Sequence, residues 1–304
     1  MSGGRRTQGG GRLGAMHTWE RWRATAVHLD VGGRAVATYE HGDPEGTPFT
    51  FLHGYPSSSL DLAPVLDHLG DGWRALALDL PGFGASESTP GEPPTVAGAA
   101  DAVEALWADR GVTSTVLVAH DYGATVGQEL VARHADDTLP IALSAVLWMN
   151  GGLYPDLHRP TAGQQLLLDP EHGAEIAAAI TRDTFVDAIV ATWGSRVPPD
   201  RDELAEMHAA LADGGGDVLM HELLSYIPQR VRFADRWAAA LTTDLPTTYV
   251  WGDADPVSGA HMIEGVGQRA GGTPRIVRMA DVGHWPPLEA PDVVAAEIRA
   301  LDPG

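Results

Sequence analysis

The stretch from Val116 to Ala124, VLVAHDYGA, constrains the fold of this chain more than any other. Its first four residues are apolar, which is typical of a buried parallel strand. The run that follows, to Arg133, has apolar residues at helical spacing, so a strand becomes a helix within three residues. A bend that tight needs small residues on both sides of its centre, and Ala119 and Gly123 provide them. The side chain at the centre, Asp121, is therefore predicted to project from the tip of the bend.

This arrangement matches a nucleophile elbow, the motif usually written G-x-S-x-G. Here Ala119 replaces the first glycine, and Asp121 stands where the motif has serine. A carboxylate can attack carbon without a base to activate it, and it leaves an ester that must then be hydrolysed. The N-terminus of the following helix also favours the charged form of the carboxylate. We therefore predict that Asp121 is a nucleophile; the alternative is an aspartate that only caps the helix.

On both sides of this bend, apolar strands alternate with helical runs. This alternation predicts an α/β fold with a mostly parallel, twisted sheet and helices on both faces. Residues 151–233 differ, because they contain several helical runs and no clear strand. We therefore predict four parts: a disordered extension (1–15), a first part of the sheet domain (16–150), an inserted helical cap (151–233) and a second part of the sheet domain (234–304).

The charge balance is strongly acidic, with 41 acidic and 20 basic residues. Nucleic acids and anionic membranes are therefore not expected as partners, because both require a basic surface. There is no cysteine, so neither a disulfide nor a thiolate metal site is expected. No apolar run reaches the roughly 18 residues of a membrane span, and the first 15 residues do not resemble a secretory signal. A cytoplasmic location is the default expectation, and the oligomeric state stays open.

Reactive side chains follow the predicted strands at their carboxyl ends, where open parallel sheets bind their ligands. Asp255 follows one late strand and His284 follows the next. With Asp121 they give the order nucleophile, acid, histidine, which is typical of hydrolase triads. We predict that His284 activates the water that hydrolyses the ester, and that Asp255 orients His284. Asp253 is the alternative acid, whereas Asn150, at another strand end, cannot balance a histidine charge.

Five motifs make the chain resemble α/β-hydrolases of the epoxide hydrolase and haloalkane dehalogenase branch. They cover roughly residues 26–300 and comprise HGYP (53–56), DLPGFG (79–84), HDYG (120–123), DADP (253–256) and GHWP (283–286). Within that branch, HDYG, NGG (150–152), HRP (158–160) and SYIPQR (225–230) are most similar to the group of the mesoderm-specific transcript protein and its bacterial relatives. The resemblance implies an α/β-hydrolase fold with an inserted helical cap. It also implies an oxyanion hole formed by the backbone N–H groups of Tyr55 and Tyr122.

The same resemblance bears on the leaving group, because epoxide hydrolases protonate the epoxide oxygen with two cap tyrosines. One of the two lies about thirty residues before the triad acid, and Tyr226 matches it. The other usually lies about 45 residues after the nucleophile, where this chain has no tyrosine, so Tyr154 is the expected substitute. Tyr226 could alternatively be a core residue of the cap. Trp193 and Trp285 are expected to line the pocket.

Dehalogenases usually carry a tryptophan directly after the nucleophile, and this chain has Tyr122 there. The sequence therefore favours an epoxide hydrolase that forms a vicinal diol from a small apolar substrate and water, without a metal or cofactor. A haloalkane or haloacid dehalogenase is the second hypothesis. A binding protein that kept the fold without catalysis is the third. A serine esterase is disfavoured, because no serine occupies the elbow.

Overall fold

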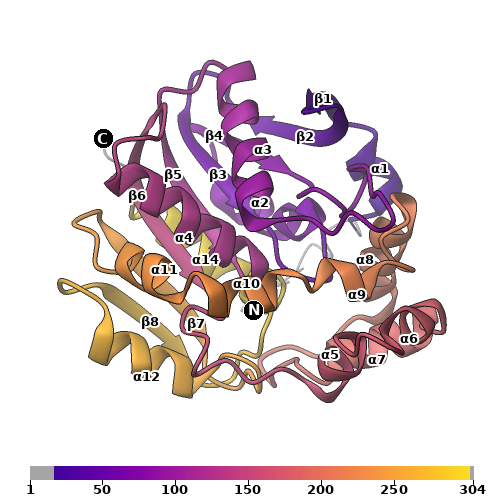
Figure 1. The fold of residues 1–304 in the computed structure, drawn as a ribbon. Helices are drawn as coiled ribbons and strands as arrows, with labels where there is room; N and C mark the ends of the chain where they lie inside the picture. Colours follow the sequence, from indigo (N-terminus) through magenta and orange to yellow (C-terminus); the bar gives the residue numbers. More distant parts are fainter. Residues whose placement is uncertain (1–16, 302–304) are drawn as a thin grey trace, which may run out of the picture.

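The computed structural model describes residues 17–301, and Figure 1 shows their fold. Within these residues, eight strands form one sheet in the order β1-β2-β4-β3-β5-β6-β7-β8. The predicted extension 1–15 lies outside the described residues. The strands span Val27–Val31 (β1), Arg34–Gly42 (β2), Thr47–Leu52 (β3), Trp73–Leu78 (β4), Ser114–His120 (β5), Ala142–Met149 (β6), Thr247–Gly252 (β7) and Arg275–Met279 (β8).

The helices precede the hairpin of β1 and β2, connect the later strands and close the chain. They span Trp19–Arg23 (α1), Ser59–Leu62 (η1, a 3₁₀-helix), Ala63–Leu69 (α2), Val96–Asp109 (α3), Tyr122–Ala135 (α4), Ala162–Leu167 (α5), Gly173–Ala178 (α6), Arg182–Val190 (α7), Arg201–Asp213 (α8), Met220–Leu223 (α9), Tyr226–Arg232 (α10), Ala234–Ala240 (α11), Ala260–Arg269 (α12), Pro286–Glu289 (α13) and Pro291–Arg299 (α14).

The sheet is parallel from β4 across to β8, whereas β2 pairs in the antiparallel sense with both of its neighbours, β1 and β4. This confirms the predicted mostly parallel sheet. After β3 the chain adds β4 on one side, and β5 then returns to the other side of β3. The order of strands thus reverses between β3 and β5, and in open sheets ligands bind outside the carboxyl ends of such strands.

Both faces of the sheet are covered, so the side chains of the central strands are buried on either side. In β5, Leu117 and Ala119 pack on the face covered by α3 and α4. The alternate residues Val116 and Val118 pack on the other face, which α2 and α14 cover. A fully apolar strand such as 116–119 is therefore what this position in the sheet requires.

Helices α5 to α10 lie between β6 and β7 in the sequence, and we call residues 151–233 the covering segment. Figure 1 shows α5 to α9 gathered beside the sheet domain, whereas α10 lies next to α4. Near the end of this segment the helix is interrupted at Leu224 and Ser225, which separate the two short helices α9 and α10. Whether the covering segment is a separate domain stays a prediction.

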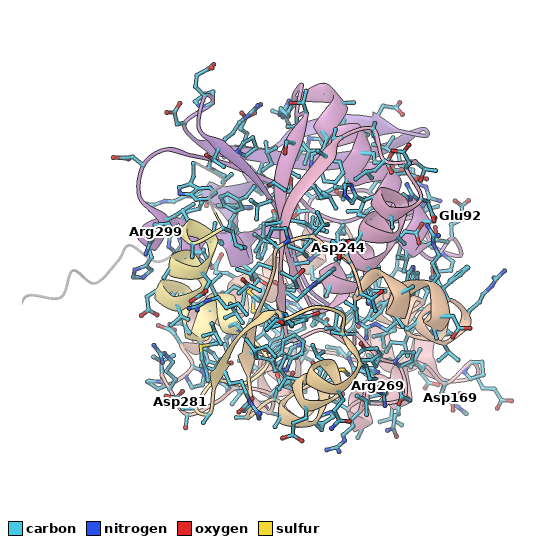
Figure 2. The ribbon with its side chains drawn as sticks, turned by 90° about the vertical axis from the view of Figure 1, so that its left-hand side faces the viewer. Glu92, Asp169, Asp244, Arg269, Asp281 and Arg299 are labelled. Carbon is cyan, nitrogen blue, oxygen red and sulfur yellow. The ribbon has the colours of Figure 1, made fainter. Side chains whose placement is uncertain are left out.

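Charged side chains lie mainly on the outside of the molecule. Figure 2 shows Glu92, Asp169 and Asp281 at the periphery, and all three are exposed. Within residues 17–301, no helix has the length and apolar character needed to cross a membrane.

Candidate active site

The bend at Asp121 has the strained geometry expected from the sequence. Strand β5 ends at His120, helix α4 begins at Tyr122, and Asp121 between them has φ 43° and ψ −105°. A Cβ at Gly123 would lie 2.3 Å from the carbonyl oxygen of Leu52, so only glycine fits there. The Gly123 N–H donates to the His53 carbonyl at 2.9 Å. The elbow is thereby fixed against the end of β3.

The two oxygens of the Asp121 carboxylate have different surroundings. Oδ2 accepts a hydrogen bond from the Tyr55 N–H at 2.9 Å. Oδ1 lies 3.6 Å from Nη2 of Arg230, which is beyond normal hydrogen-bond distance. Burial opposes the charged form, but His284 and Arg230 outweigh it and lower the pKa of Asp121. The carboxylate is therefore ionised, and Oδ1 is the oxygen free to attack.

His284 connects this carboxylate to a second one. Its Nδ1 lies 2.8 Å from Oδ2 of Asp255, and its Nε2 lies 4.0 Å from Oδ2 of Asp121. Burial disfavours the imidazolium, but the two carboxylates raise the pKa of His284 to about 9. Despite burial, His284 lowers the pKa of Asp255 to about 2. The alternative acid, Asp253, instead pairs with Arg278 in a partly exposed contact.

Asp255 is held by several further donors. The Val257 N–H, the Ser258 hydroxyl and Nδ2 of Asn150 all donate to its carboxylate, at 2.7, 2.8 and 3.0 Å. The sequence excludes Asn150 as the triad acid and predicts no other role for it. The structure shows it as a positioning group, whose Nδ2 also donates to the Gly252 carbonyl at 2.9 Å.

The two other histidines of the motifs make hydrogen bonds within the sheet domain. Nε2 of His120 donates to the His284 carbonyl at 2.7 Å, and Nε2 of His53 accepts from the Leu80 N–H at 2.9 Å. Burial lowers the pKa of each to about 4, so both are neutral. They support the loops around the carboxylate.

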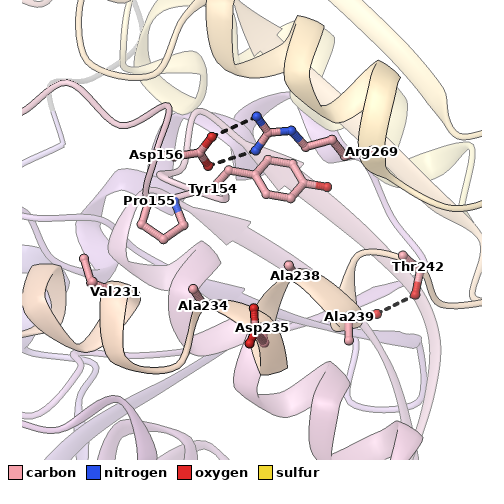
Figure 3. A pocket seen from close by; sticks show the side chains of 10 residues that line it. All are labelled: Tyr154, Pro155, Asp156, Val231, Ala234, Asp235, Ala238, Ala239, Thr242 and Arg269. Atoms are coloured by element: carbon pink, nitrogen blue, oxygen red, sulfur yellow. Dashed lines mark hydrogen bonds and ion pairs between the residues drawn. The ribbon is translucent and has the colours of Figure 1, made fainter.

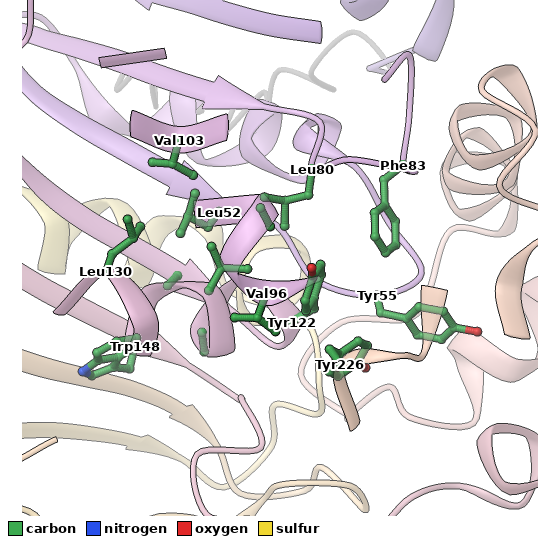
Figure 4. Packing of buried hydrophobic residues seen from close by; sticks show 14 of the residues in the cluster. Leu52, Tyr55, Leu80, Phe83, Val96, Val103, Tyr122, Leu130, Trp148 and Tyr226 are labelled. Carbon is green, nitrogen blue, oxygen red and sulfur yellow. The ribbon is translucent and has the colours of Figure 1, made fainter. Parts of the chain in front are cut away.

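Three tyrosines gather beside Asp121, and Figure 4 shows them with Phe83. The ring of Tyr226 stacks on Tyr122 at 4.6 Å between centroids and lies 6.2 Å from Tyr55. The Tyr226 hydroxyl is buried and has no hydrogen-bond partner among residues 17–301. Burial and the charge of Asp121 raise its pKa well above the ordinary value, so it stays protonated.

Tyr122 is the first residue of α4, and the first backbone N–H groups of a helix have no partner within the helix. The oxyanion role predicted for its N–H stays a prediction.

A cavity of about 250 Å³ lies between these groups and the covering segment. Tyr55, His284 and Trp285 form its wall on the side of the sheet domain. Asp121 and Tyr226 are not among the lining residues, but the Asp121 carboxylate accepts from the Tyr55 N–H and lies 4.0 Å from Nε2 of His284. The expectation for Trp285 thus agrees with its position. The opposite wall is mainly apolar and includes Leu167, Ile176, Ile180, Phe185 and Ile189.

The structure does not bring Tyr154 or Trp193 to this cavity. Tyr154 lines a more open depression of about 810 Å³ beside α11 and α12, shown in Figure 3. The guanidinium of Arg269 covers its ring at 5.0 Å and pairs with Asp156, which holds the loop in that place. Trp193 lines a third cavity, and its Nε1 donates to the Val197 carbonyl at 2.9 Å.

Arg230 is the residue at the site that the sequence reading did not assign. It lies on α10, is 1% exposed and contacts both the carboxylate and the backbone of Asp121. The SYIPQR motif contains it, but nothing in the spacing distinguishes it from other basic residues. Within the part of the chain that the structure describes, no three His, Asp or Glu side chains are grouped as a metal site.

Comparisons with known proteins agree with this fold. The model of the alpha/beta hydrolase family matches residues 51–297. The protein LipZ of Mycobacterium tuberculosis is 31% identical over 284 residues, which cover 92% of this chain and 94% of LipZ. The mesoderm-specific transcript homolog protein of Bos taurus is 31% identical over 255 residues, 80% of this chain and 74% of that protein.

Solved structures show the same fold. The haloalkane dehalogenase DbeA from Bradyrhizobium elkani has a TM-score of 0.75 at 20% identity, over 91% of this chain and 98% of DbeA. At that identity the likeness concerns the fold alone. With the family model matched over most of the length and the strands in the expected order, the chain belongs to the alpha/beta hydrolase family.

Proposed function

We propose that this hydrolase uses Asp121 as a nucleophile and forms a covalent ester with its substrate. The observation that carries the proposal is the placing of one ionised carboxylate at a strained bend, 2.9 Å from the Tyr55 N–H and 4.0 Å from Nε2 of His284. A nucleophile, an oxyanion donor and a base oriented by Asp255 are the parts that ester formation and hydrolysis need.

In the first step, Oδ1 of Asp121 attacks an electrophilic carbon. If the substrate is an epoxide, the bond from this carbon to the ring oxygen breaks as the ester bond forms. The ring oxygen then takes the proton of the Tyr226 hydroxyl, whose burial beside Asp121 keeps it protonated. The tyrosinate regains its proton from solvent before the next turnover.

Forming the ester removes the charge of Asp121, one of the two carboxylates that raise the pKa of His284, so the imidazolium releases its proton to solvent. In the second step, the neutral Nε2 of His284 removes a proton from water, and the hydroxide attacks Cγ of Asp121. The charge that forms on Oδ2 faces the Tyr55 N–H. The Cγ–Oδ1 bond then breaks, and the departing oxygen takes the proton held by His284. Oδ1 therefore leaves in the diol, and an oxygen from water replaces it on Asp121.

The pocket favours a small apolar epoxide. An apolar cavity of about 150 Å³ is large enough for benzene. The cavity of about 250 Å³ found here therefore suits a single ring with a short side chain. Its apolar wall gives no partner for a charged tail, whereas the unpartnered Tyr226 hydroxyl lies near Asp121.

Dehalogenation is the second candidate, because the haloalkane dehalogenase DbeA shares the fold. A halide leaves without a proton and needs N–H donors instead. Dehalogenases usually carry a tryptophan directly after the nucleophile, and its N–H can bind the halide. This chain has Tyr122 at that position, and its side chain has no N–H group. We therefore place epoxide opening ahead of dehalogenation.

Isotope transfer tests the covalent step. A single turnover with excess enzyme in water enriched in ¹⁸O should leave the heavy oxygen on the Asp121 peptide, and the diol formed should be unlabelled. The His284→Gln variant should accumulate the ester of Asp121, seen by mass spectrometry. Styrene oxide and 1-bromobutane serve as probes of the two leaving groups. Label in the diol instead of the peptide would show that water attacks the substrate directly.

A further inference from the structure

Arg230 makes an unusual set of contacts for a basic residue. Its Nε donates to the Thr125 hydroxyl at 2.6 Å, and its Nη2 donates to the Asp121 carbonyl at 3.2 Å. Its guanidinium carbon lies 4.6 Å from the centre of the Tyr226 ring. All three partners belong to the elbow, to the first turns of α4 or to the same helix as Arg230. The contacts therefore connect the covering segment to the nucleophile.

The chain leaves space for this side chain. A Cβ at Gly152 would lie 2.3 Å from Nη1 of Arg230 and 3.2 Å from Cδ2 of His158. Burial and Arg230 lower the pKa of His158 to about 3, so His158 does not add a charge. Glycine at 152 thus allows the guanidinium to reach the elbow.

A guanidinium that is 1% exposed needs a negative partner, since an unpaired buried charge is strongly disfavoured. The carboxylate that lies within 4 Å of it, among the described residues, is that of Asp121. The 3.6 Å distance to Oδ1 leaves the oxygen without a hydrogen bond from Arg230. Such a contact favours the charged form and does not occupy the lone pairs that must attack.

Building on the function proposed above, we propose that Arg230 is the counter-ion and positioning residue of the Asp121 nucleophile. It holds the carboxylate so that Oδ1 faces the substrate carbon and Oδ2 accepts the hydrogen bond from the Tyr55 N–H. It also places the α10 helix, and with it Tyr226, against the elbow. When Asp121 becomes an ester, the negative partner of Arg230 is lost. The buried cation then favours the charge that returns to Oδ2 when water attacks.

The charged and titratable groups around Asp121 come from several elements. His284, on the loop after β8, and Arg230 lower its pKa, and so do His120 at the end of β5 and the Tyr55 N–H. His53, His158, Tyr55 and Tyr226 also feel its charge.

The kinetic test measures the rate of ester formation with styrene oxide in single turnovers, as a function of pH. Arg230→Met should slow ester formation by about 100-fold. It should also move the acid limb of the profile up by about one pH unit or more. Arg230→Lys should restore the position of the acid limb on the pH axis but not the full rate of ester formation. A single ammonium nitrogen cannot take the positions of both Nε and Nη2, which bond Thr125 and the Asp121 carbonyl. Arg236→Met, which removes a partly exposed arginine of α11, is the matched control and should behave as wild type.

A second measurement does not depend on catalysis. Asp121→Asn, Arg230→Met and the double variant are unfolded in urea and their midpoints compared. A counter-ion pair predicts that the double variant loses less than the sum of the single losses. Additive losses, or an unchanged acid limb in Arg230→Met, would overturn the proposal. If wild type forms no ester with any epoxide or haloalkane, the proposed function fails, while the unfolding comparison still decides the role of Arg230.

Discussion

Raising the pH from 6.5 to 9 should destabilise the folded protein through His284. The pKa of this residue rises from 6.5 to about 9 on folding, although burial opposes the shift, because Asp255 and Asp121 face the ring. Below pH 6.5 the folded and unfolded states both hold the proton, so the full stabilisation is present. Between the two values only the folded state holds it, and the stabilisation is lost as the pH rises through 9. At about 1.4 kcal/mol per pH unit, the loss is about 3 kcal/mol.

Urea unfolding of wild type and His284→Gln at intervals from pH 6 to 9.5 measures this contribution. The unfolding free energy of wild type should fall by about 3 kcal/mol more than that of the variant over this range. Because Asp255 loses its cation in His284→Gln, the variant combined with Asp255→Asn is the control, and its profile should be similarly flat. Parallel profiles for wild type and both variants would refute the argument that the two carboxylates hold a proton on His284.

Further predictions concern the pocket. Tyr226→Phe should slow ring opening by at least about 100-fold in single turnovers with an epoxide, since it removes the proton donor. Tyr154→Phe should match wild type in the same assay, because its ring lines a different depression. Leu167→Trp should exclude ring-bearing epoxides and spare short aliphatic ones, measured as kcat/KM across a size series. Gly152→Ala should cost about 1–3 kcal/mol of unfolding free energy, because its Cβ would collide with Arg230.

The sheet and the meeting of the candidate side chains at its edge could be predicted from the sequence because their signals are local. A run such as 116–119 can only be a strand buried on both faces, and Gly123 marks the close approach of β3. Asp255 and His284 follow strands directly, so the topology alone brings them to one edge. The family motifs then agree with the positions that the sheet dictates.

The covering segment could be predicted only in outline. Helices α5 and α6 have six residues each, which is too short to hold a fixed position without tertiary contacts. No tyrosine lies about 45 residues after Asp121, so Tyr154 is the expected substitute, but the pairing of Asp156 with Arg269 holds that tyrosine elsewhere. The SYIPQR motif contains Arg230 but does not reveal its role, because that role depends on burial, and burial of a charged residue appears only in three dimensions.

The hydrogen bonds of the Glu289 carboxylate bear on the route by which substrate enters the pocket. This carboxylate accepts hydrogen bonds from the N–H groups of Gly283 and Trp285, on either side of His284, and from that of Gly194 in the covering segment. The His284 N–H also donates to the Thr192 carbonyl at 2.9 Å. Swinging the end of α7 outward would therefore pull the base away from the ester. We expect the entrance for substrate and product to open at α5 and α6. The segment near Thr192 should keep its hydrogen bonds throughout the reaction.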